Sequence, residues 1–339
     1  MSTVAILGAG SWGTALAVLL AERRPWLWEH RAERATALLQ SRRNPRYLPD
    51  TVLPDSIRVS NDLPAVVAAS DVLVLAVPSH AMRDVARQVQ RAGPARDPIA
   101  INVAKGLELD TGKRMSEVLG EELQLSARQI VSLVGPSHAE EVVRGMPTTV
   151  VVAGRDEHVL QRVQELFTTE SFRVYTNPDL VGVELGVSLK NVIAIAAGVC
   201  DGLGFGDNSR GALFTRGLAE MTRLGIALGA RAETFAGLAG LGDLVTTATS
   251  RHSRNRNLGE AIGRGRSLPE ALAAIDQVAE GVRTTRAAME LSRQHGVEMP
   301  ITSQVFQILF EGKDPRQALR DLMLRAPKPE SWSATRGAS

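Results

Sequence analysis

The chain has 339 residues, which exceeds the roughly 100 to 200 residues of a typical domain, so we expect two domains with a site between them. Hydrophobic residues make up 44% and charged residues 22%, a composition that excludes disordered and fibrous proteins. Lys and Arg number 39 against 37 Asp and Glu, so a net charge of +2 gives no broad basic field for nucleic acid. We therefore expect a small-molecule partner and no nucleic acid.

The first twenty residues raise the question of a membrane span or a signal sequence, because no charged side chain precedes Glu22. No basic region opens the segment, however, and small residues between Gly8 and Thr14 replace the leucines that either would need. The single cysteine, Cys200, lies in an apolar run and is expected to be a buried, unreactive thiol. We expect a cytoplasmic protein without membrane insertion.

The first half of the chain alternates short β-branched runs with helical patterns. This alternation predicts an α/β fold, a Rossmann-type, doubly wound and mainly parallel sheet over residues 1–178. The expected strands are Val4–Leu7, Trp26–Trp28, Val72–Val77, Ile99–Val103, Val131–Val134 and Thr148–Val152.

A glycine-rich turn, Gly8-Ala9-Gly10-Ser11-Trp12-Gly13, follows the first strand and precedes a helix. In such a turn the first glycine permits the tight bend, the second lets the backbone approach a pyrophosphate, and the third allows close helix–strand packing. The helix N-terminus adds free N–H groups. The turn therefore predicts a bound dinucleotide, with Trp12 either covering it, wedging the domains apart or packing in the core.

The ribose end of this dinucleotide site is less regular. Glu29 closes the second strand at about the distance where an acidic residue binds a ribose, but Arg31 follows and suits a 2'-phosphate. Pro25 also stands where the strand should begin, and His30 is equally well explained as part of a solvated charge run. The cofactor is thus NAD or NADP, with the preference open.

The second half of the chain changes to long helical patterns. After Gly135-Pro136, Ser137 and Glu140 have the spacing of a capping box that starts a helix. Asp179 can cap a helix that runs through Ile193. We expect an all-helical domain over residues 179–326, followed by a polar, flexible tail at 327–339.

A lysine in the middle of that apolar helix is the strongest candidate for chemistry. Burial lowers the pKa of an ammonium toward neutrality, which suits Lys190 to giving a proton to a carbonyl, although a surface-directed side chain is the alternative. Glu184 lies seven residues before Asn191 and is expected to orient it. Lys105 follows a strand, at the edge where ligands of parallel sheets bind, and a surface lysine in a loop is the alternative.

An anion site is indicated further along the chain. Asp243 and Thr247, four residues apart, share one side of a predicted helical turn. Arg254 and Asn255, in the run that begins at Ser253, offer the donors that bind a phosphate. Because no aromatic residues interleave, we favour an anion pocket over a nucleic-acid patch.

Placed in order, these motifs give the chain a resemblance to bacterial NAD(P)-dependent glycerol-3-phosphate dehydrogenases over nearly its whole length. The departures are His138, where an aromatic residue is usual, and the shortened link into Trp26. The matching blocks are the glycine turn from Gly8, Arg46-Tyr47-Leu48-Pro49, Lys105-Gly106-Leu107-Glu108, Gly135-Pro136-Ser137, Val183-Glu184-Leu185, Leu189-Lys190-Asn191, Asp201 to Gly206, Gly240-Leu241-Gly242-Asp243, Ser253-Arg254-Asn255 and Glu280-Gly281-Val282.

The resemblance implies interconversion of dihydroxyacetone phosphate and sn-glycerol 3-phosphate, which supplies phospholipid synthesis, with Lys190 as catalytic proton donor or acceptor. Substrate positions are Lys105, Gly135, Ser137, Asp243, Ser253, Arg254 and Asn255, to which the arguments above add Lys190, Asn191 and Thr247. Dinucleotide positions are Ser11, Trp12, Arg31, Ala139, Val278 and Glu280, together with Gly8, Gly10, Gly13, Lys105 and Arg254. A homodimer is the default expectation, and no metal is expected.

Two other functions are compatible with the residues alone. One is a dehydrogenase of similar architecture that acts on a hydroxy acid or a sugar acid, which would need a carboxylate site. The other is a non-catalytic nucleotide-binding regulator, which would keep the glycine turn but have no use for a buried Lys190. Rates with dihydroxyacetone phosphate distinguish all three.

Overall fold

The computed structural model describes residues 2–94, 97–275 and 278–330. Its N-terminal part, the sheet region (residues 4–177), contains an eight-stranded sheet of strand order β10-β9-β8-β7-β6-β1-β2-β5. The strands are β1 (Val4–Leu7), β2 (Trp26–Trp28), β5 (Arg58–Ser60), β6 (Val72–Leu75), β7 (Ile99–Asn102), β8 (Ile130–Val134), β9 (Thr148–Ala153) and β10 (Phe172–Asn177), and a separate hairpin pairs β3 (Arg43–Asn44) with β4 (Leu48–Val52).

The predicted doubly wound, mainly parallel sheet is confirmed. All neighbouring strands run parallel except β8 and β9, which are antiparallel. Each of the six strands predicted from sequence is present, with ends that match or differ by at most two residues. The two edge strands β5 and β10 and the hairpin were missed, because edge strands are short or bury only one face and give a weak hydrophobic signal.

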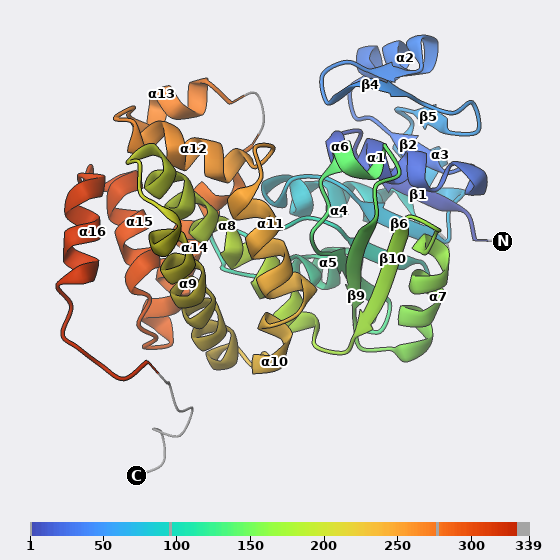
Figure 1. The fold of residues 1–339 in the computed structure, drawn as a ribbon. Helices are drawn as coiled ribbons and strands as arrows, with labels where there is room; N and C mark the ends of the chain where they lie inside the picture. Colours follow the sequence, from blue (N-terminus) through green and yellow to red (C-terminus); the bar gives the residue numbers. More distant parts are fainter. Residues whose placement is uncertain (1, 95–96, 276–277, 331–339) are drawn as a thin grey trace.

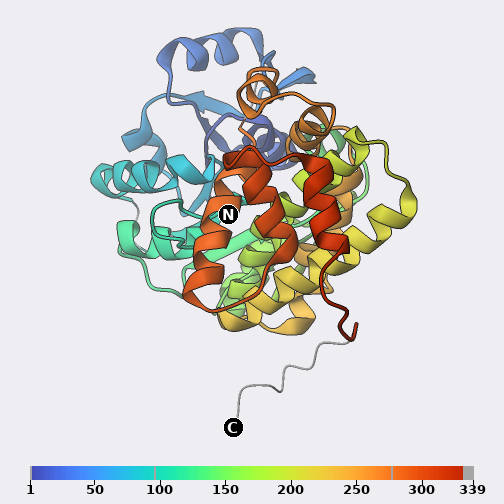
Figure 2. The ribbon, with the colours of Figure 1, turned by 90° about the vertical axis from the view of Figure 1, so that its left-hand side faces the viewer.

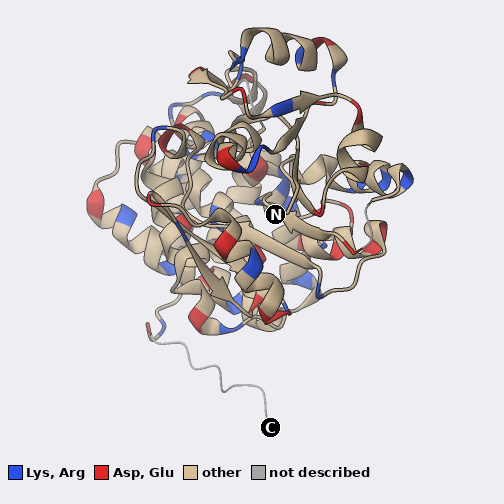
Figure 3. Ribbon diagram, turned by 90° about the vertical axis from the view of Figure 1, so that its right-hand side faces the viewer, with Lys and Arg blue, Asp and Glu red and all other residues tan. Residues whose placement is uncertain are grey.

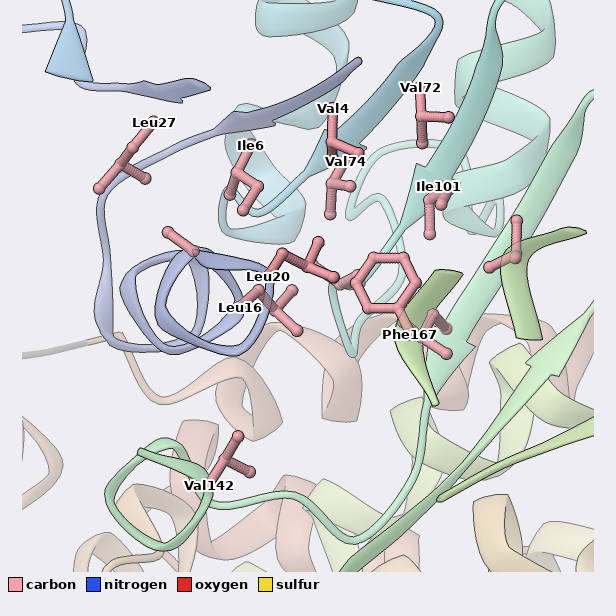
Figure 4. Packing of buried hydrophobic residues seen from close by; sticks show 14 of the residues in the cluster. Val4, Ile6, Leu16, Leu20, Leu27, Val72, Val74, Ile101, Val142 and Phe167 are labelled. Atoms are coloured by element: carbon pink, nitrogen blue, oxygen red, sulfur yellow. The ribbon is translucent and has the colours of Figure 1, made fainter. Parts of the chain in front are cut away.

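Helices cover both faces of the sheet because successive strand residues point to opposite sides. Val4 and Ile6 of β1 pack with one set of helices, and Ala5 and Leu7 pack with the other. Figure 4 shows the first of these cores, with Leu16 and Phe167 from two different helices converging on the strands. The first face carries α1 (Ser11–Leu19), α2 (Ala32–Ser41), α6 (Ala139–Val142) and α7 (Glu157–Phe167), and the second carries α3 (Leu63–Ala68), α4 (Met82–Ala92) and α5 (Met115–Leu123).

The C-terminal part, the helical region (residues 180–323), has no strand within the described residues, as predicted. Its helices lie beside the sheet region in Figure 1, and Figure 2 shows the last of them, orange-red to red, at the front. They are α8 (Leu180–Gly202), α9 (Asp207–Ala227), α10 (Ala232–Phe235), α11 (Asp243–Thr249), α12 (Arg254–Gly263), α13 (Leu268–Ala273), α14 (Glu280–Gln294), α15 (Pro300–Phe310) and α16 (Pro315–Met323).

Helix α8 is the central element of the helical region and also joins it to the sheet. Asp179 caps it as predicted, since its Oδ1 accepts from the Gly182 N–H at 2.9 Å. Its first turns pack on β8 and β9 through Val183 and Val187, and its later turns form the core of the helical region. Among the described residues it is the one helix long and apolar enough to cross a membrane, but 94% of that stretch is buried inside the protein.

Four further expectations concern the first residues, Cys200, the charge distribution and the tail. The uncharged first residues form β1 and α1, so they belong to the sheet core. Cys200 is half-buried rather than fully buried, and desolvation raises the pKa of its thiol to about 11, which keeps it protonated. Along the ribbon in Figure 3, segments with Lys or Arg and segments with Asp or Glu are interspersed on the side shown. The expected tail falls mainly on residues 331–339, which lie outside the described residues.

Candidate functional site

The glycine turn has the geometry that a pyrophosphate site requires. Gly8 has a φ of +118°, and a Cβ there would lie 2.6 Å from the Ala76 carbonyl oxygen. A Cβ on Gly13 would lie 1.9 Å from the Gly8 carbonyl oxygen, so the helix can approach the strand only without a side chain. A Cβ on Gly10 would meet nothing within 4 Å, which leaves this point open to a ligand. These positions therefore fit the predicted dinucleotide.

The glycine turn leads into the N-terminus of α1 and is held in place by a buried side chain. No side chain of the described residues caps α1, which begins at Ser11, so its N-terminal dipole faces the open side of the turn. The buried Asn44 donates hydrogen bonds to the Ala9 carbonyl oxygen at 2.9 Å and to Thr14 Oγ1 at 2.8 Å. Sequence reasoning missed Asn44, because its partners lie 30 and 35 residues away.

Trp12 packs within the sheet region rather than between the domains. Its ring centroid lies 6.4 Å from that of Phe172, and it packs against the small cluster of Leu48 and Ala139. The wedge between domains considered for Trp12 is not seen among its described contacts, and its half-buried ring is compatible with both packing and a contact to the dinucleotide. Ala139, the first residue of α6, is buried in the same cluster.

The residues predicted at the ribose end contact one another. The buried Glu29 accepts a hydrogen bond from the Arg31 N–H at 3.1 Å, and its Oε1 lies 2.9 Å from His30 Nδ1. The exposed Arg31 side chain donates to His30 Nε2 at 3.2 Å. An acidic and a basic group thus lie together at the end of β2. The acidic Glu29 suits a ribose hydroxyl, and the basic Arg31 suits a 2'-phosphate.

Two lysines and one aspartate from three different elements meet at the centre of the candidate site. Asp243 begins α11, directly after a π-helical turn at Leu238–Gly242. Its Oδ2 lies 3.1 Å from Lys190 Nζ of α8 and 3.1 Å from Lys105 Nζ, which follows β7. Lys190 also donates a hydrogen bond to Thr247, one turn further along α11. The structure thus brings together Lys105, Lys190, Asp243 and Thr247.

The charges in this cluster do not cancel, because two ammonium groups share one carboxylate. Burial, followed by repulsion from Lys105 and Arg254, lowers the pKa of Lys190 to about 7, although Asp243 opposes the shift. Burial alone would raise the pKa of Asp243, but the two lysines outweigh it and hold that pKa below its usual value. Lys190, only 3% exposed, is therefore the group that can release a proton near neutral pH.

Lys105 is held in place from two sides. Its Nζ donates to the Gly135 carbonyl oxygen at 2.6 Å, and its own carbonyl oxygen accepts from Asn191 Nδ2 at 3.0 Å. The Ser137 hydroxyl also donates to the Gly135 carbonyl oxygen, at 2.9 Å. The predicted capping box at Ser137 is therefore wrong, because α6 begins only after His138 and the Ser137 hydroxyl is used two residues back along the turn.

The expectation that Glu184 orients Asn191 is also wrong. Asn191 Oδ1 accepts a hydrogen bond from Asn255 Nδ2 at 2.9 Å, and its amide nitrogen binds the Lys105 carbonyl. Glu184 points instead to the sheet region, where it binds Asn102 among others. Residues seven apart lie on the same side of a helix, but neighbouring elements decide which of them meet.

Arg254 is the available cation of the site. It begins α12 with Ser253 as the cap, whose side chain accepts from the Arg256 N–H at 3.2 Å. Arg254 is exposed and has no hydrogen bond or ion pair with any residue that the structure describes, whereas Arg256 is paired with Asp201 at 2.6 Å. Asn255 is buried and already bridges α8 and α14, since its Oδ1 accepts from the Gly281 N–H at 2.9 Å.

The remaining predicted cofactor residues lie at the start of α14. Val278 is half-buried just before this helix, and Glu280 is its first residue. Glu280 accepts hydrogen bonds from the Ser79 N–H, at 3.0 Å, and from the Ser79 hydroxyl. This contact joins the loop after β6 to the helical region. Sequence reasoning missed it, because 201 residues separate the partners and no local pattern marks the pair.

An open groove of about 560 Å³ flanks the outer side of α11. His138 and His252 lie on its wall with their ring centroids 5.9 Å apart. Burial and the nearby Lys105 lower the pKa of His138, which is therefore neutral at physiological pH. His138, the position where an aromatic residue is usual, thus lies beside the lysine cluster, at the edge of the candidate site.

Comparison with known proteins assigns this geometry to a family. A family model described as NAD-dependent glycerol-3-phosphate dehydrogenase N-terminus matches residues 3–160, and one described as NAD-dependent glycerol-3-phosphate dehydrogenase C-terminus matches residues 179–320. A relative from Chlorobium chlorochromatii (strain CaD3), named glycerol-3-phosphate dehydrogenase (NAD(P)+), is 54% identical over 97% of this chain and 99% of its own length. The chain belongs to the NAD(P)-dependent glycerol-3-phosphate dehydrogenase family.

A solved structure and a second relative agree with this membership of the glycerol-3-phosphate dehydrogenase family. A crystal structure of glycerol-3-phosphate dehydrogenase from Coxiella burnetii superposes with a TM-score of 0.90 at 40% sequence identity, covering 96% of this chain and 99% of that one. A relative from Moorella thermoacetica (strain ATCC 39073 / JCM 9320) with the same name as the Chlorobium protein is 53% identical over 95% of this chain and 96% of its own length. The resemblance inferred from the motifs is confirmed.

Proposed function

We propose that this chain interconverts dihydroxyacetone phosphate and sn-glycerol 3-phosphate with NAD(H) or NADP(H). The observation that carries the proposal is the buried Lys190 beside Asp243, with an unpaired Arg254 on the next helix. A proton donor and a free cation on neighbouring helices suit a ketone that bears a phosphate. The names of the close relatives support the same substrate pair.

Lys190 acts as the proton donor in the reductive direction. With a pKa of about 7 it is charged in a large fraction of molecules at neutral pH and yet gives up its proton readily. The reduced nicotinamide, when bound, supplies the hydride to the ketone carbon. Lys190 then protonates the oxygen of the developing alkoxide, and Asp243, itself bound by Lys105, keeps the Lys190 ammonium group in place.

Arg254 anchors the phosphate of the substrate, remote from the reacting carbonyl. Its guanidinium offers a planar set of donors, and Asn255, fixed between α8 and α14, retains an amide N–H that can reach the same anion. Binding of the phosphate orients the ketone toward Lys190, so the binding energy holds the carbonyl in line with the proton donor. Lys105, Gly135, Ser137, Asn191, Thr247 and Ser253 complete the proposed substrate site.

The dinucleotide lies along the glycine turn in this proposal. The open face at Gly10 and the uncapped start of α1 receive the pyrophosphate. Arg31 takes the ribose end, and the preference between NAD and NADP follows from the balance between Arg31 and Glu29. The other proposed contacts are Ser11, Trp12, Ala139, Val278 and Glu280, with Lys105 and Arg254 reaching the cofactor from the substrate side.

One experiment tests substrate and cofactor together. The purified protein is assayed with dihydroxyacetone phosphate against NADH and against NADPH, and a 2-keto acid serves as the comparison substrate. We expect turnover with the phosphorylated ketone and none with the keto acid. A faster rate with the keto acid would support the hydroxy-acid dehydrogenase, and no oxidation with either would support a non-catalytic regulator.

The location, assembly, cellular role and domain division of the chain are separate proposals. We propose a cytoplasmic homodimer that makes glycerol 3-phosphate for phospholipid synthesis. We also propose that residues 1–178 form the dinucleotide-binding domain and residues 179–326 the helical substrate domain. Sedimentation of the purified protein measures the oligomeric state, and separate expression of the two segments tests the domain division.

A further inference from the structure

Glu184 is a buried carboxylate that the proposed reaction does not use. It lies on α8, six residues before Lys190, and is 3% exposed. Its two oxygens accept five hydrogen bonds. The donors are the Ser116 N–H at 2.9 Å, the Ser116 hydroxyl, Arg114 Nη1 at 2.9 Å, the Ser132 hydroxyl at 2.8 Å and Asn102 Nδ2 at 3.2 Å.

Every one of these partners belongs to the sheet region, and every one is a donor. A carboxylate has only acceptor sites, so the match to five donors is complete, whereas an amide would place its own N–H groups against them. Arg114 also provides a positive charge that offsets the burial of Glu184. The arrangement fastens α8, which carries Lys190, to β7, β8 and the start of α5.

Asn102 links Glu184 to the loop that carries Lys105 through hydrogen bonds. Its Nδ2 donates to Glu184 and, at 3.0 Å, to Ser132 Oγ. Its Oδ1 accepts from the Ala104 N–H at 2.9 Å, and its Nδ2 lies 3.3 Å from the Ala104 carbonyl oxygen. The next residue is Lys105, whose carbonyl oxygen is bound by Asn191 of α8. The loop is therefore held at both of its ends relative to α8.

We propose that Glu184 and Asn102 are positioning residues for the proposed reaction: Glu184 fixes Asn102, and Asn102 fixes the loop after β7 so that Lys105 stays against Asp243 beside Lys190. The inference rests on the proposed role of Lys190 as proton donor. Neither residue touches the substrate in this arrangement. They act through the position of the Lys105 ammonium group.

The consequence is electrostatic and can be measured at Lys190. The charged groups that face Lys190 are Asp243 of α11, Lys105 of the loop and Arg254 of α12. If the loop is released, Lys105 moves away from Asp243. Lys190 then loses a repelling neighbour and no longer shares its carboxylate, and both changes favour its charged form. The pKa of Lys190 should rise.

The test compares Asn102→Ala and Glu184→Gln with the matched control Glu220→Gln. Glu220 is equally buried, at 2% exposed, and accepts hydrogen bonds from the Ile301 and Thr302 N–H groups, but it lies on α9 away from the lysine cluster. The protein is labelled with ¹³C at lysine Cε, the Lys190 signal is assigned by its loss in Lys190→Ala, and each variant is titrated by NMR. We expect the Lys190 pKa to rise by about one unit in both test variants and to stay unchanged in the control.

Kinetics with dihydroxyacetone phosphate provide the second measurement. Displacement of a catalytic group by about 1 Å can cost about 100-fold in rate, so kcat should fall about 10- to 100-fold in both variants, with a smaller change in KM. The alkaline limb of the pH–rate profile should move upward with the Lys190 pKa. The control should keep the kcat and the profile of the unchanged protein.

The outcomes separate this inference from the proposed function. An unchanged Lys190 titration in Asn102→Ala, with lower thermal stability alone, would mean that the network is merely structural and would overturn the inference. If Glu184→Gln does not fold, Asn102→Ala still decides, because four of the five donors to Glu184 remain. Failure of the unmodified protein to reduce the ketone would reject the proposed function, while the NMR titration would still decide the positioning role.

Discussion

The chemistry of this protein is concentrated in one carboxylate shared by two ammonium groups. Asp243 lies 3.1 Å from both Lys105 and Lys190, and the deeper of the two lysines has its pKa lowered to about 7. Burial is the largest cause of this shift, the attraction to Asp243 opposes it, and repulsion from Lys105 adds to it. The second lysine therefore lowers the pKa of Lys190 further than burial beside one carboxylate would.

Replacing Lys190 with alanine tests the proton donor directly. We expect Lys190→Ala to lower kcat for ketone reduction about 100- to 10,000-fold, the usual contribution of a general acid. The fold should survive, because Lys105 still neutralises Asp243. Titration of NADH fluorescence should give an unchanged Kd. A variant that retains more than a tenth of the rate would exclude Lys190 as the donor.

The pH dependence of the unmodified protein follows from the same group. Reduction needs Lys190 protonated, so kcat/KM for dihydroxyacetone phosphate should fall as the pH rises through about 7. Oxidation of glycerol 3-phosphate needs the neutral amine, so its kcat/KM should rise over the same range. Initial rates in both directions between pH 5.5 and 9 check this. If kcat/KM changed in the same direction with pH for reduction and for oxidation, the assignment of Lys190 would be contradicted.

Arg254 can be tested against a neighbour on the same helix. A charge-assisted hydrogen bond contributes about 1.5 to 3 kcal/mol, so Arg254→Ala should raise KM for dihydroxyacetone phosphate about 10- to 100-fold. Arg256→Ala is the control, because that guanidinium is already paired with Asp201. It should lower stability and leave KM unchanged. Equal KM values for the two variants would remove Arg254 from the phosphate site.

At the scale of elements, α8 is the helix on which the site depends. Its first turn is capped by Asp179, its middle carries Lys190 and Asn191, and its last turns pack closely on α12. The close contact is possible because Gly198 has no side chain where the two backbones meet. Since α12 begins with Arg254 and Asn255, the packing of these two helices sets the distance between proton donor and anion site.

A methyl group at this contact should force the two helices apart. In Gly198→Ala the added Cβ would lie 1.9 Å from the Arg256 carbonyl oxygen and 2.7 Å from the Glu260 nitrogen, both in the α12 backbone. We expect the free energy of unfolding to fall by about 1 to 3 kcal/mol, as in other overpacked sites. Urea denaturation measures this change.

Gly211 in α9 provides the opposite case. It is exposed within its helix, and a Cβ there would meet nothing within 4 Å. Gly211→Ala should therefore stabilise the protein by up to about 1 kcal/mol through helix propensity. The same sign of change in both variants would contradict the packing argument for Gly198.

At the scale of the whole molecule, the site exists only because the two regions are joined. Lys105 of the sheet region reaches Asp243, Glu184 of α8 reaches into the sheet, and Ser79 binds Glu280 at the start of α14. These three contacts lie on the side of the sheet where the parallel strands end. Proton donor, anion site and glycine turn are therefore held in one arrangement by polar contacts, rather than by a flexible link.

The stability of the whole molecule should depend on pH through Glu220. Burial raises the pKa of Glu220 to about 7, against 4.5 for an unperturbed side chain. The folded protein therefore binds this proton more tightly than the unfolded chain does. The resulting stability is fully present below pH 4.5 and is lost as the pH rises through about 7, a total of about 3 kcal/mol.

Glu220→Gln isolates this contribution. Urea unfolding of the variant and of the unmodified protein at pH 5 and at pH 8 gives the difference in their free energies of unfolding. We expect the unmodified protein to lose stability relative to the variant over this interval. A difference that does not change with pH would mean that Glu220 titrates normally in the folded state.

The sequence by itself determined the fold class, the glycine turn and the candidates Lys190, Asp243 and Arg254. These signals are local: strand alternation, a six-residue turn, a lysine within an apolar helix, and residues four apart. Local patterns failed at Ser137 and at the edge strand β10, where neighbouring segments decide the outcome. Only the tertiary structure decided that Glu184 binds Asn102 rather than Asn191, and that Lys105 and Lys190 share Asp243. The physical reason is that charges separated by up to 138 residues interact through space, and only the packing of α8 on the sheet fixes their distances.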